Sequence, residues 1–594
     1  MKTGYLITAR LKSTRLPRKL LREVQGKPIL CHMLDRLKLA RSVEQIVICT
    51  SPLEEDRPLV ELARQNGVSS FRGEPEDVLL RLLGAAREFG FDYVLNITAD
   101  CPLVDPVYAD NIVEAYHRTG ADLIRTFDLP HGAFSYGIRP EALQKITEIK
   151  DSEHTEVWGR YFTDTDLFDV YDLPIENPLH RQPGLRMTLD YPEDLRFFEA
   201  IFDELYREGE VFSLDDVLEL LERRPDIVDM NRHCTKPFTR RLNAQSEISL
   251  KARHKVQRAA IVGCGSIGQR HVRNLRQLGI TELVALRSRK GHFSDLPAEL
   301  NIKETTDPQA VVDAHPDVAI ISNPTSLHLK AAERLLPHVR GLFLEKPIAA
   351  SLDGIDAFLN RVRELKKVTF VGHNLQFHPA VLAIQDLLAE GSLGDPLVLQ
   401  CQVGQWLPDW HPYEDFRKAY YARKDLGGGV GLSLIHEVHL AQELLGPIDS
   451  VCGLFPPHES LPLEVDVVAD LMTRHRGGAV SQIHLDFIQR PVHRCGVLSC
   501  DHGWVRYDLI RPLVEAQIAD EPEPRVIWDG ADADPNQQYV DEMATFLRYV
   551  REGRVRHTHD AFRATQSLAA LITAQQLPTC GCGAKVPDWV LGLG

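Results

Sequence analysis

The sequence predicts an α/β protein in which two units built on parallel sheets precede an α+β unit with a mainly antiparallel sheet. The 594 residues exceed a single core and, at roughly 100 to 200 residues per domain, predict three to five domains. Short β-branched runs alternate with amphipathic stretches in residues 1–240 and again in 257–375, which is typical of right-handed β-α-β crossovers. In residues 376–594 longer strands follow one another, as an antiparallel sheet requires. The polar, basic segment 241–256 is interpreted as a linker.

The first unit alternates strands with helices whose apolar residues recur every three or four positions. The expected strands are residues 5–9, 45–51, 93–98 and 122–126, and the expected helices are 27–41, 59–67, 76–90 and 108–118. Helices of this length between strands predict a mainly parallel sheet, and therefore an α/β sandwich.

The second unit starts afresh with a strand at residues 259–263 and a helix that ends at Leu278. Its further strands are expected at 282–286, 318–323, 341–347 and 368–374, with helices near 308–314 and 328–336 and after 347. The long strands of the third unit are expected at 397–406, 466–474, 477–487, 495–500 and 503–508, before a return to helix from about Asn536. The two halves carry different glycine signatures, which argues against duplication of one module.

The composition limits the possible functions. With 44% hydrophobic and 26% charged residues the chain is typical of folded globular proteins, and a net charge of −16 disfavours nucleic acid as a partner. No run of eighteen apolar residues occurs, so we expect neither a membrane span nor a signal peptide. Eleven scattered cysteines indicate a reducing cytoplasm. The close pair Cys580 and Cys582 is interpreted as part of a flexible loop, with a metal or redox site as the alternative.

The loop after the first strand concentrates cations and hydroxyls where an open α/β sheet binds its ligands. The candidate ligand-binding residues of this loop are Ala9, Arg10, Ser13, Thr14, Arg15 and Lys19. Cations cancel the charge of a polyphosphate, and loop N–H groups cradle its oxygens. The alternative is a solvated charged surface.

Two aspartates add a metal to this picture. Asp100 follows a strand end, and Asp190 stands in RMTLDYPEDL. Mg²⁺ prefers carboxylate oxygens together with substrate phosphates. With the cationic loop, these carboxylates predict nucleotidyl transfer.

Five ordered motifs resemble the cytidylyltransferases, most closely CMP-KDO synthetases, CMP-nonulosonate synthetases and the spore-coat polysaccharide type. The motifs are A-R-x-x-S-T-R-L-P-x-K at 9–19, GKP at 26–28, RGEPEDVLLR at 72–81, DCPLVDP at 100–106 and LDYPEDL at 189–195. The resemblance covers nearly all of residues 1–230 and implies a nucleotidyltransferase α/β sandwich.

The resemblance also implies roles for individual residues. Arg10, Arg15 and Lys19 would hold the triphosphate of CTP, Arg10 and Lys19 as catalytic groups, and Asp100 and Asp190 would hold Mg²⁺. The nucleotide pocket would be lined by Ala9, Ser13, Thr14, Arg72, Gly73 and Asp77. A sugar-acid hydroxyl would attack the α-phosphate of CTP, and pyrophosphate would leave.

The acceptor loop departs from the family. In the spore-coat branch an acidic pair often follows the glycine of this loop, whereas this chain has Ser135 and Tyr136 near that place. A phosphorylated alcohol or a phosphonate is therefore kept as an alternative acceptor.

A glycine motif opens the second unit. Gly263, Gly265 and Gly268 lie between a strand and a helix that starts with Ser266 and Ile267, which is the context that a dinucleotide-binding G-x-G-x-x-G needs. The first glycine permits a tight turn, the second lets the backbone approach a pyrophosphate, and the third lets helix and strand pack closely. The sequence therefore predicts a Rossmann domain.

The end of the next strand bears on cofactor choice. An NAD site usually has an acidic residue there, whereas this chain offers Arg287, Ser288 and Arg289. These groups suit a 2′-phosphate, so NADP is preferred, and NAD or dual use is the alternative if the two arginines are only surface cations.

The chain from about residue 257 to 580 resembles the glucose–fructose oxidoreductase/inositol dehydrogenase/MocA family. The motifs are SNPTSLH at 322–328, EKP at 345–347, VGHNLQFHP at 371–379 and GGGVGLSLIHEVH at 427–439, with a longer likeness, WLPDWHPYEDFRKAYYARKDLGGG, to a branch found in surface-sugar synthesis. The resemblance implies that Lys346 positions the reacting oxygen near the nicotinamide and that His436 transfers the proton. It also places Asn323, His328, Glu345 and Lys346 beside the cofactor.

The second half departs from its family as well. Leu432 and Ser433 stand where an acidic residue usually precedes the catalytic histidine, and His439 replaces a common Asp. A module that binds NAD(P) as a sensor is therefore the alternative to a dehydrogenase. HEVH lacks the HExxH spacing and a third ligand, which argues against zinc.

Together these features predict a cytoplasmic bifunctional enzyme with Mg²⁺ and NADP (or NAD) as cofactors. Its partners would be CTP and a sugar acid, with neither nucleic acid nor membrane, and both families imply a homo-oligomer, either a dimer or a tetramer.

Overall fold

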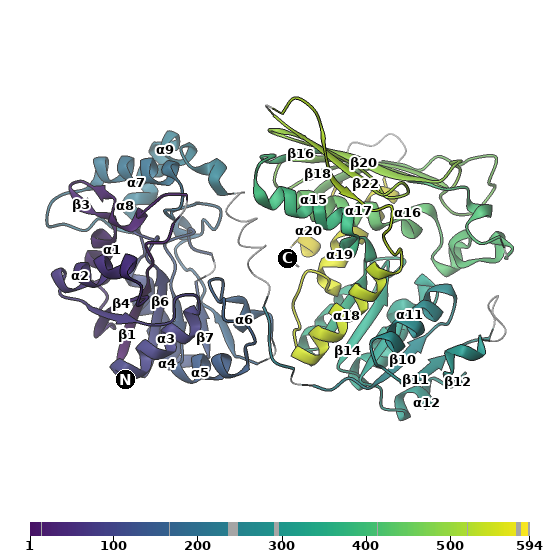
Figure 1. Cartoon of the computed structure of the whole chain (residues 1–594), viewed down its shortest axis with the longest axis horizontal. Helices are drawn as coiled ribbons and strands as arrows, with labels where there is room; N and C mark the ends of the chain where they lie inside the picture. Colours follow the sequence, from purple (N-terminus) through teal and green to yellow (C-terminus); the bar gives the residue numbers. More distant parts are fainter. Residues whose placement is uncertain are drawn as a thin grey trace. The chain divides into compact units, whose positions relative to one another are not determined.

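The computed structural model describes the chain except residues 14, 127, 166, 236–247, 253, 290–295, 413, 520, 578–583 and 592–594. The described chain forms two compact units, Met1–Lys251 and Ala252–Gly594 (Figure 1). Thr14, Cys580, Cys582 and residues 241–247 and 253 of the predicted linker lie outside the described residues.

The first unit is built on a seven-stranded sheet in the order β5-β4-β1-β6-β8-β7-β9. Its strands are β1 (Thr3–Thr8), β4 (Gln45–Thr50), β5 (Ser69–Arg72), β6 (Tyr93–Thr98), β7 (Leu123–Arg125), β8 (Tyr136–Ile138) and β9 (Val170–Asp172), with a separate ribbon of β2 (Glu23–Val24) and β3 (Lys27–Pro28). Its helices are α1 (Ile29–Leu37), α2 (Arg57–Gln65), α3 (Val78–Phe89), α4 (Pro106–Thr119), α5 (Pro140–Ile149), α6 (Arg160–Thr163), α7 (Pro192–Leu205), α8 (Leu214–Arg223) and α9 (Pro225–Asp229). Short 3-10 turns occur at η1 (Lys19–Leu21), η2 (Glu54–Asp56), η3 (Pro178–His180) and η4 (Arg232–Cys234).

The central strand β1 explains why this unit is a sandwich. Tyr5 and Ile7 point into a core shared with α1, α2 and α4, whereas Leu6 points into the opposite core with α3 and α5. Because β1 is parallel to β4 and β6, Thr8 lies beside Thr98 at the carboxyl ends of both strands. The loop after β1 and Asp100 after β6 are thereby brought to the same edge of the sheet.

The second unit contains a six-stranded, wholly parallel sheet in the order β12-β11-β10-β13-β14-β15. Its strands are β10 (Arg258–Val262), β11 (Glu282–Leu286), β12 (Lys303–Thr305), β13 (Val318–Ile321), β14 (Gly341–Glu345) and β15 (Val368–Gly372), joined by helices α11 (Ser266–Gln277), α12 (Pro308–Asp313), α13 (His328–Leu335) and α14 (Ile355–Leu365). The predicted cofactor residues lie at the carboxyl ends of these strands or in the segments that follow them, and Glu345 is the last residue of β14.

A nine-stranded sheet completes the second unit, in the order β23-β22-β21-β20-β16-β19-β18-β17-β24. Its strands are β16 (Pro396–Gly404), β17 (Ile448–Leu454), β18 (Val468–His475), β19 (Val480–Asp486), β20 (His493–Cys500), β21 (Gly503–Asp508), β22 (Leu513–Ile518), β23 (Arg525–Asp529) and β24 (Ala584–Lys585). The remaining helices are α15 (Pro379–Glu390), α16 (Val430–Ser433), α17 (His436–Leu445), α18 (Gln537–Glu552), α19 (Ala561–Gln575) and α20 (Asp588–Leu591). The sheet is mainly antiparallel as predicted, with one parallel pair, β16 and β19.

Helix α18 returns to the parallel sheet although it lies near the end of the chain. Phe546 packs against Phe343 and Phe370, with ring centroids 5.6 and 5.9 Å away. In Figure 1, α18 accordingly lies beside β14, away from the large sheet that α15 and α17 cover. Helix α18 therefore belongs to the core of the parallel sheet.

None of the helices in the described part of the chain is long and apolar enough to cross a membrane.

Candidate functional site

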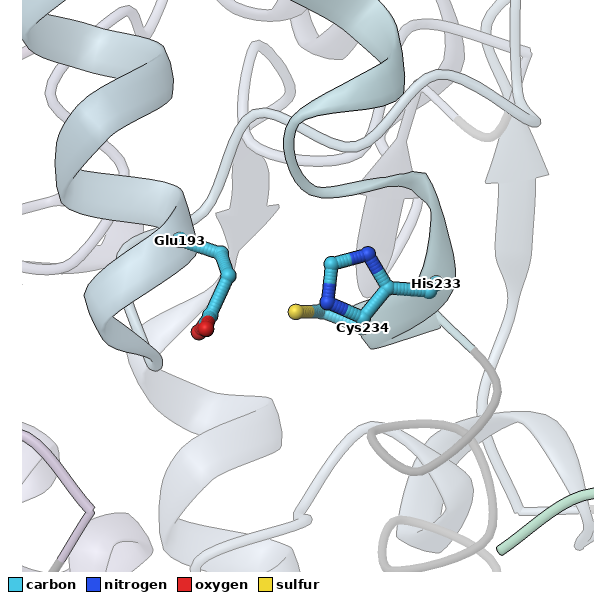
Figure 2. A group of neighbouring side chains, drawn as sticks. All are labelled: Glu193, His233 and Cys234. Carbon is cyan, nitrogen blue, oxygen red and sulfur yellow. The ribbon is translucent and has the colours of Figure 1, made fainter. Parts of the chain in front are cut away.

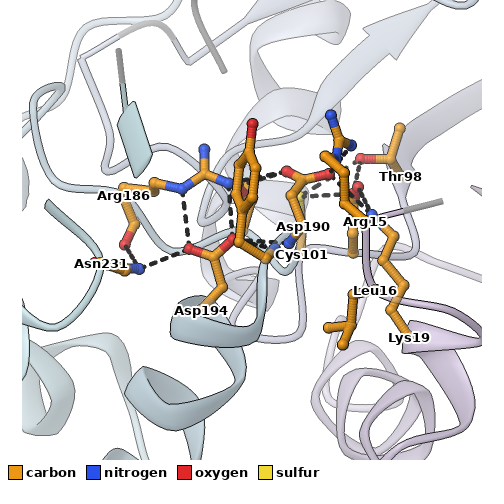
Figure 3. A network of polar contacts seen from close by, with 12 residues as sticks. Arg15, Leu16, Lys19, Thr98, Cys101, Arg186, Asp190, Asp194 and Asn231 are labelled. Atoms are coloured by element: carbon orange, nitrogen blue, oxygen red, sulfur yellow. Dashed lines mark hydrogen bonds and ion pairs between the residues drawn. The ribbon is translucent and has the colours of Figure 1, made fainter. Parts of the chain in front are cut away.

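The loop after β1 places a lysine between the two predicted magnesium ligands. The Lys19 ammonium lies 2.8 Å from Asp100 Oδ2 and 3.0 Å from Asp190 Oδ1. Arg15 donates to the same oxygen of Asp190 at 3.0 Å, and Figure 3 shows both cations beside it. Asp100 follows β6 and Asp190 precedes α7, so residues remote in sequence converge at the carboxyl edge of the sheet.

The charges at this point stabilise one another. Burial alone would raise the pKa of Asp100, but the Lys19 ammonium and hydrogen bonds lower it to about 2. Burial lowers the pKa of Lys19, yet the two carboxylates raise it above its usual value. Asp100 and Asp190 thus hold one cation between them, and such a pair of carboxylates fits Mg²⁺.

A second layer of charge, absent from the sequence predictions, fixes Asp190. Arg186 donates to Asp190 Oδ2 at 3.0 Å and to both oxygens of Asp194 at 3.0 and 2.9 Å. Asp194 also accepts the main-chain N–H of Asp190 at 2.8 Å, and the Asn231 amide donates to it at 3.0 Å (Figure 3). Because these groups are almost fully buried, they hold the Asp190 carboxylate in one orientation.

Arg10 pairs with different carboxylates. Its guanidinium lies 2.7 Å from Asp56 and 3.9 Å from Glu76, and it donates to the Pro75 carbonyl. The buried Asp56 also accepts the N–H of Leu11 at 2.7 Å. Arg10 therefore ties its loop to η2 and to the segment after β5, and a triphosphate contact by Arg10 remains a prediction.

The other predicted nucleotide residues surround this loop. Ala9 donates its N–H to a main-chain oxygen of β4 at 3.0 Å, and Ser13 Oγ accepts an N–H three residues later at 3.4 Å. Arg72 donates to a carbonyl of the loop after β4 at 2.6 Å. All three are thereby oriented by main-chain groups.

Asp77 and Gly73 shape the segment after β5. Asp77 caps α3, accepting the N–H of Leu80 at 3.1 Å and the hydroxyl of Thr155 at 2.9 Å, and it forms an ion pair with Lys150. A Cβ at Gly73 would lie 2.6 Å from a phenyl ring. The Asp77 carboxylate is thus engaged by the protein itself, so it positions the segment.

A cavity of about 290 Å³ opens beside Asp100. Tyr136 and Trp158 form part of its wall, with ring centroids 4.9 Å apart, and Arg125 and Arg160 also line it. Each of these guanidiniums pairs with a neighbouring aspartate. Tyr136 thus lines the cavity at the place where the acidic pair was expected.

The glycine loop after β10 has the geometry of a close turn. Gly263 has φ +90°, and a Cβ there would lie 2.6 Å from the Asn323 backbone. A Cβ at Gly268 would lie 2.2 Å from the Gly263 carbonyl, whereas the space at Gly265 is open. Helix α11 begins with Ser266 and Ile267, so the N–H groups of both residues lie at its N-terminus. A helix N-terminus favours a bound anion.

The arginines after β11 differ in availability. Arg287 is buried and pairs with Glu304 of β12 at 2.6 Å, whereas the Arg289 side chain is 62% exposed and lies 3.9 Å from Glu304. Ser288 is exposed between them. The sequence did not indicate Glu304, because it lies on the neighbouring strand, and it offsets part of the positive charge expected here.

The loops after β13 and β14 are joined by a histidine. The ring nitrogens of His328 lie 2.8 Å from the carbonyl oxygens of Asn323 and Pro347, so its ring links the two loops. Within the described residues, Asn323 Oδ1 is buried without a hydrogen-bond partner, which leaves an acceptor for a cofactor. Glu345 pairs with His271 at 2.6 Å; burial would raise its pKa, but His271 lowers it below the usual value.

Lys346 and His436 form the candidate redox site. The Lys346 ammonium donates to the Ser433 carbonyl at 2.5 Å, and burial lowers its pKa to about 8. Burial and the charge of Lys346 lower the pKa of His436 well below its usual value, and among the described residues its Nδ1 has no partner. His436 is therefore neutral at pH 7 and close to Lys346, as proton transfer requires.

Glu437 and His439, which follow His436 in HEVH, each have partners of their own. Glu437 forms an ion pair with Arg494 at 2.5 Å, and the Glu437 side chain is buried. His439 stacks on His373 with centroids 3.7 Å apart, and its Nε2 lies 2.7 Å from the Gln376 amide. His439 thus hydrogen bonds to Gln376, and the absence of zinc at HEVH stays a prediction.

The relatives fall into two groups. The chain is 28% identical to the Bacillus subtilis spore coat polysaccharide biosynthesis protein SpsF over 37% of this chain and 95% of that protein. It is 27% identical to an 8-amino-3,8-dideoxy-manno-octulosonate cytidylyltransferase of Shewanella pealeana, over 32% and 71% of the two chains. It is 31% identical to the scyllo-inositol 2-dehydrogenase (NAD(+)) of Bacillus subtilis, over 34% of this chain and 57% of that enzyme.

Family models divide the chain in the same way. Residues 5–244 match the cytidylyltransferase family. Residues 257–373 match the NAD-binding Rossmann fold of the GFO/IDH/MocA oxidoreductases, and 381–506 match the C-terminal domain of that family. The chain therefore joins a cytidylyltransferase-family domain to the Rossmann and C-terminal domains of a GFO/IDH/MocA-family oxidoreductase.

Proposed function

We propose that the first unit transfers CMP from CTP to a sugar acid and releases pyrophosphate. The observation that carries this proposal is the meeting of Asp100 and Asp190 around one cation, beside a cavity lined by Arg125 and Arg160. The two guanidiniums, each already paired with an aspartate, are the candidate hydrogen-bond donors to an acceptor carboxylate, and the aromatic wall suits the apolar face of a sugar ring.

The charged groups divide the work. Asp100 and Asp190 are the residues that hold Mg²⁺, which when bound offsets the charge of the triphosphate. Lys19 and Arg15 lie at the same point and bind phosphate oxygens as the nucleotide enters. The acceptor oxygen then forms a bond to the α-phosphorus of CTP as its proton passes to solvent, the bond from that phosphorus to the bridging oxygen breaks, and pyrophosphate leaves with the negative charge.

Acceptor choice tests this proposal. The full chain with Mg²⁺ and CTP is offered 3-deoxy-manno-octulosonate, its 8-amino analogue, a phosphorylated alcohol and a phosphonate, and products are identified by mass. We expect CMP-linked product with a sugar acid. Product formed only with the phosphorylated alcohol or the phosphonate would contradict the sugar-acid proposal, while leaving cytidylyl transfer in place.

We propose that the second unit oxidises or reduces a related sugar with a nicotinamide cofactor. A bound nicotinamide would accept a hydride from the sugar carbon in the oxidative direction, and His436 would take the hydroxyl proton. Lys346 holds the reacting oxygen by donating a hydrogen bond. The pKa of Lys346, lowered to about 8, lets this group exchange its proton near neutral pH, and the lowered pKa of His436 keeps its ring neutral and so able to accept the hydroxyl proton.

We expect NADP(H) to bind more tightly than NAD(H). We also expect Glu304 to reduce this difference in affinity, because its carboxylate offsets the positive charge of Arg287. Arg289→Ala should narrow the NADP/NAD affinity ratio by about fivefold, because an exposed ion pair contributes up to about 1 kcal/mol. Glu304→Gln should widen the ratio, because it releases Arg287 from its partner. Calorimetry with both cofactors measures these ratios.

Glu282→Gln is the matched control, because Glu282 is exposed at the opposite end of β11. Equal affinities in the parent protein would instead favour NAD or dual use, which the Arg287–Glu304 pair also supports.

The two units together suit successive steps of surface-polysaccharide synthesis. We place this enzyme in the cytoplasm, where CTP and NADP(H) are made, and infer a homodimer or homotetramer from its families. A sensor role for the second unit is favoured by Leu432 and Ser433 and is decided by the turnover measurements below.

A further inference from the structure

Three side chains of different chemistry meet at the surface of the first unit (Figure 2). Glu193 comes from the first turn of α7, whereas His233 and Cys234 come from η4. A carboxylate oxygen, a ring nitrogen and the Sγ atom all lie within 4.8 Å of one another. Cys234 is buried, Glu193 is half-buried and His233 is exposed, so the group opens to solvent on one side.

We propose that Glu193, His233 and Cys234 form a zinc site. Thiolate sulfur, imidazole nitrogen and carboxylate oxygen are the ligands that Zn²⁺ takes in proteins, whereas Mg²⁺ and Ca²⁺ take oxygen. Zinc–ligand bonds of about 2.0 to 2.3 Å bring two ligands of one ion within about 4 Å of each other, so small side-chain rotations close the site. Water completes the tetrahedron on the open side.

The contacts of these three side chains within the described residues also support a cation site. Across the described parts of the chain, no side-chain hydrogen bond or ion pair engages them. The neighbouring acid Asp194 is different, because Arg186 and Asn231 already bind it. The negative charge of Glu193 is therefore left for a cation.

Zinc at this place would reinforce an existing connection. Asn231 joins the segment before η4 to the first turn of α7 by donating to Asp194 at 3.0 Å, and its carbonyl accepts the Cys234 N–H at 2.9 Å. Asp194 in turn holds Arg186, which binds Asp190. We therefore assign the zinc a structural role. By binding Glu193 of α7 together with His233 and Cys234 of η4, it would hold these two elements together. The site does not depend on the proposed cytidylyl transfer.

The test is a zinc competition titration against a chromophoric chelator, using the full chain. Cys580→Ser and Cys582→Ser are introduced into every protein, so that zinc on that pair cannot be counted. We expect one zinc per chain with submicromolar affinity. Cys234→Ser, His233→Ala and Glu193→Gln should each weaken binding by at least about tenfold, because each removes a ligand. Glu199→Gln on α7 and His117→Ala on α4, both exposed, serve as matched controls.

Cobalt provides a second readout that reports the sulfur ligand directly. Co²⁺ bound to the parent chain should show a thiolate charge-transfer band that Cys234→Ser removes. If Cys234→Ser lowers the melting temperature in the absence of metal, Glu193→Gln and His233→Ala decide the question. Micromolar or weaker zinc binding by the parent, or variants that bind zinc as the parent does, would overturn the proposal.

Discussion

Asp100→Asn and Asp190→Asn are each expected to slow pyrophosphate release from CTP by about 10² to 10³-fold, while NADP(H) binding by the second unit stays unchanged. Both carboxylates hold the Lys19 ammonium in the structure and are the proposed ligands of Mg²⁺. A neutral amide removes one negative charge from that point, so the cation that offsets the triphosphate is held more weakly. Steady-state pyrophosphate release at saturating CTP, with calorimetry for NADP(H), measures both effects.

The two variants differ in their structural cost. Asp190 is buried and pairs with Arg15, Lys19 and Arg186, so its replacement removes one carboxylate partner from each of these cations and lowers the melting temperature. Asp100 is more exposed and is the cleaner test of chemistry. Asp226→Asn, on the exposed face of α9, is the matched control. Unchanged pyrophosphate release in Asp100→Asn would remove this carboxylate from the account of metal binding.

His436→Ala and Lys346→Ala are expected to slow hydride transfer by about 10² to 10⁴-fold without emptying the cofactor site, because neither residue lies in the glycine loop. His436 is near the Lys346 ammonium, and Lys346 points to the Ser433 carbonyl. His315→Ala and Lys330→Ala, both exposed, are the controls. Activity lost at constant melting temperature and constant NADPH affinity supports chemistry, whereas a lower melting temperature with residual turnover indicates a structural role.

The pH dependence separates these cases further. Because the pKa of Lys346 is lowered to about 8, its charge changes as the pH rises through 8, and the hydride-transfer rate should inflect there. The unfolded chain holds this proton up to its ordinary pKa of about 10.5, so Lys346 makes the folded state more stable as the pH rises from about 8 to 10.5. A rate profile without an inflection near pH 8 would contradict a catalytic role for Lys346.

The sequence predicted the fold class and the edges of the sheets at which the candidate site residues lie. Parallel strands bring all their carboxyl ends to one edge, so the loop after β1, Asp100 and the glycine loop could be placed from periodicity alone. The antiparallel third sheet was also predicted, except for the parallel pairing of β16 with β19, which depends on the order of strands in space.

The partners of these residues could not be predicted in the same way. Arg186 stands four residues before Asp190, and Asp194 four residues after it, and that spacing was a usable signal. Asn231 reaches Asp194 only because η4 folds back onto α7. Glu304 meets Arg287 across two strands. Contacts of this kind depend on tertiary packing, which no local pattern encodes.

Two chemistries in one chain can be measured in a single reaction that follows pyrophosphate and nicotinamide absorbance together. The full chain is mixed with Mg²⁺, CTP, NADPH or NADP⁺, and a panel of 2-keto sugar acids and related hydroxy-sugars. We expect CTP-dependent pyrophosphate release with a sugar acid and a change in nicotinamide absorbance with a sugar of the same series. NADPH binding without turnover of any keto- or hydroxy-sugar would identify the second unit as a sensor. The absence of pyrophosphate release with every sugar acid would contradict the proposed cytidylyl transfer by the first unit.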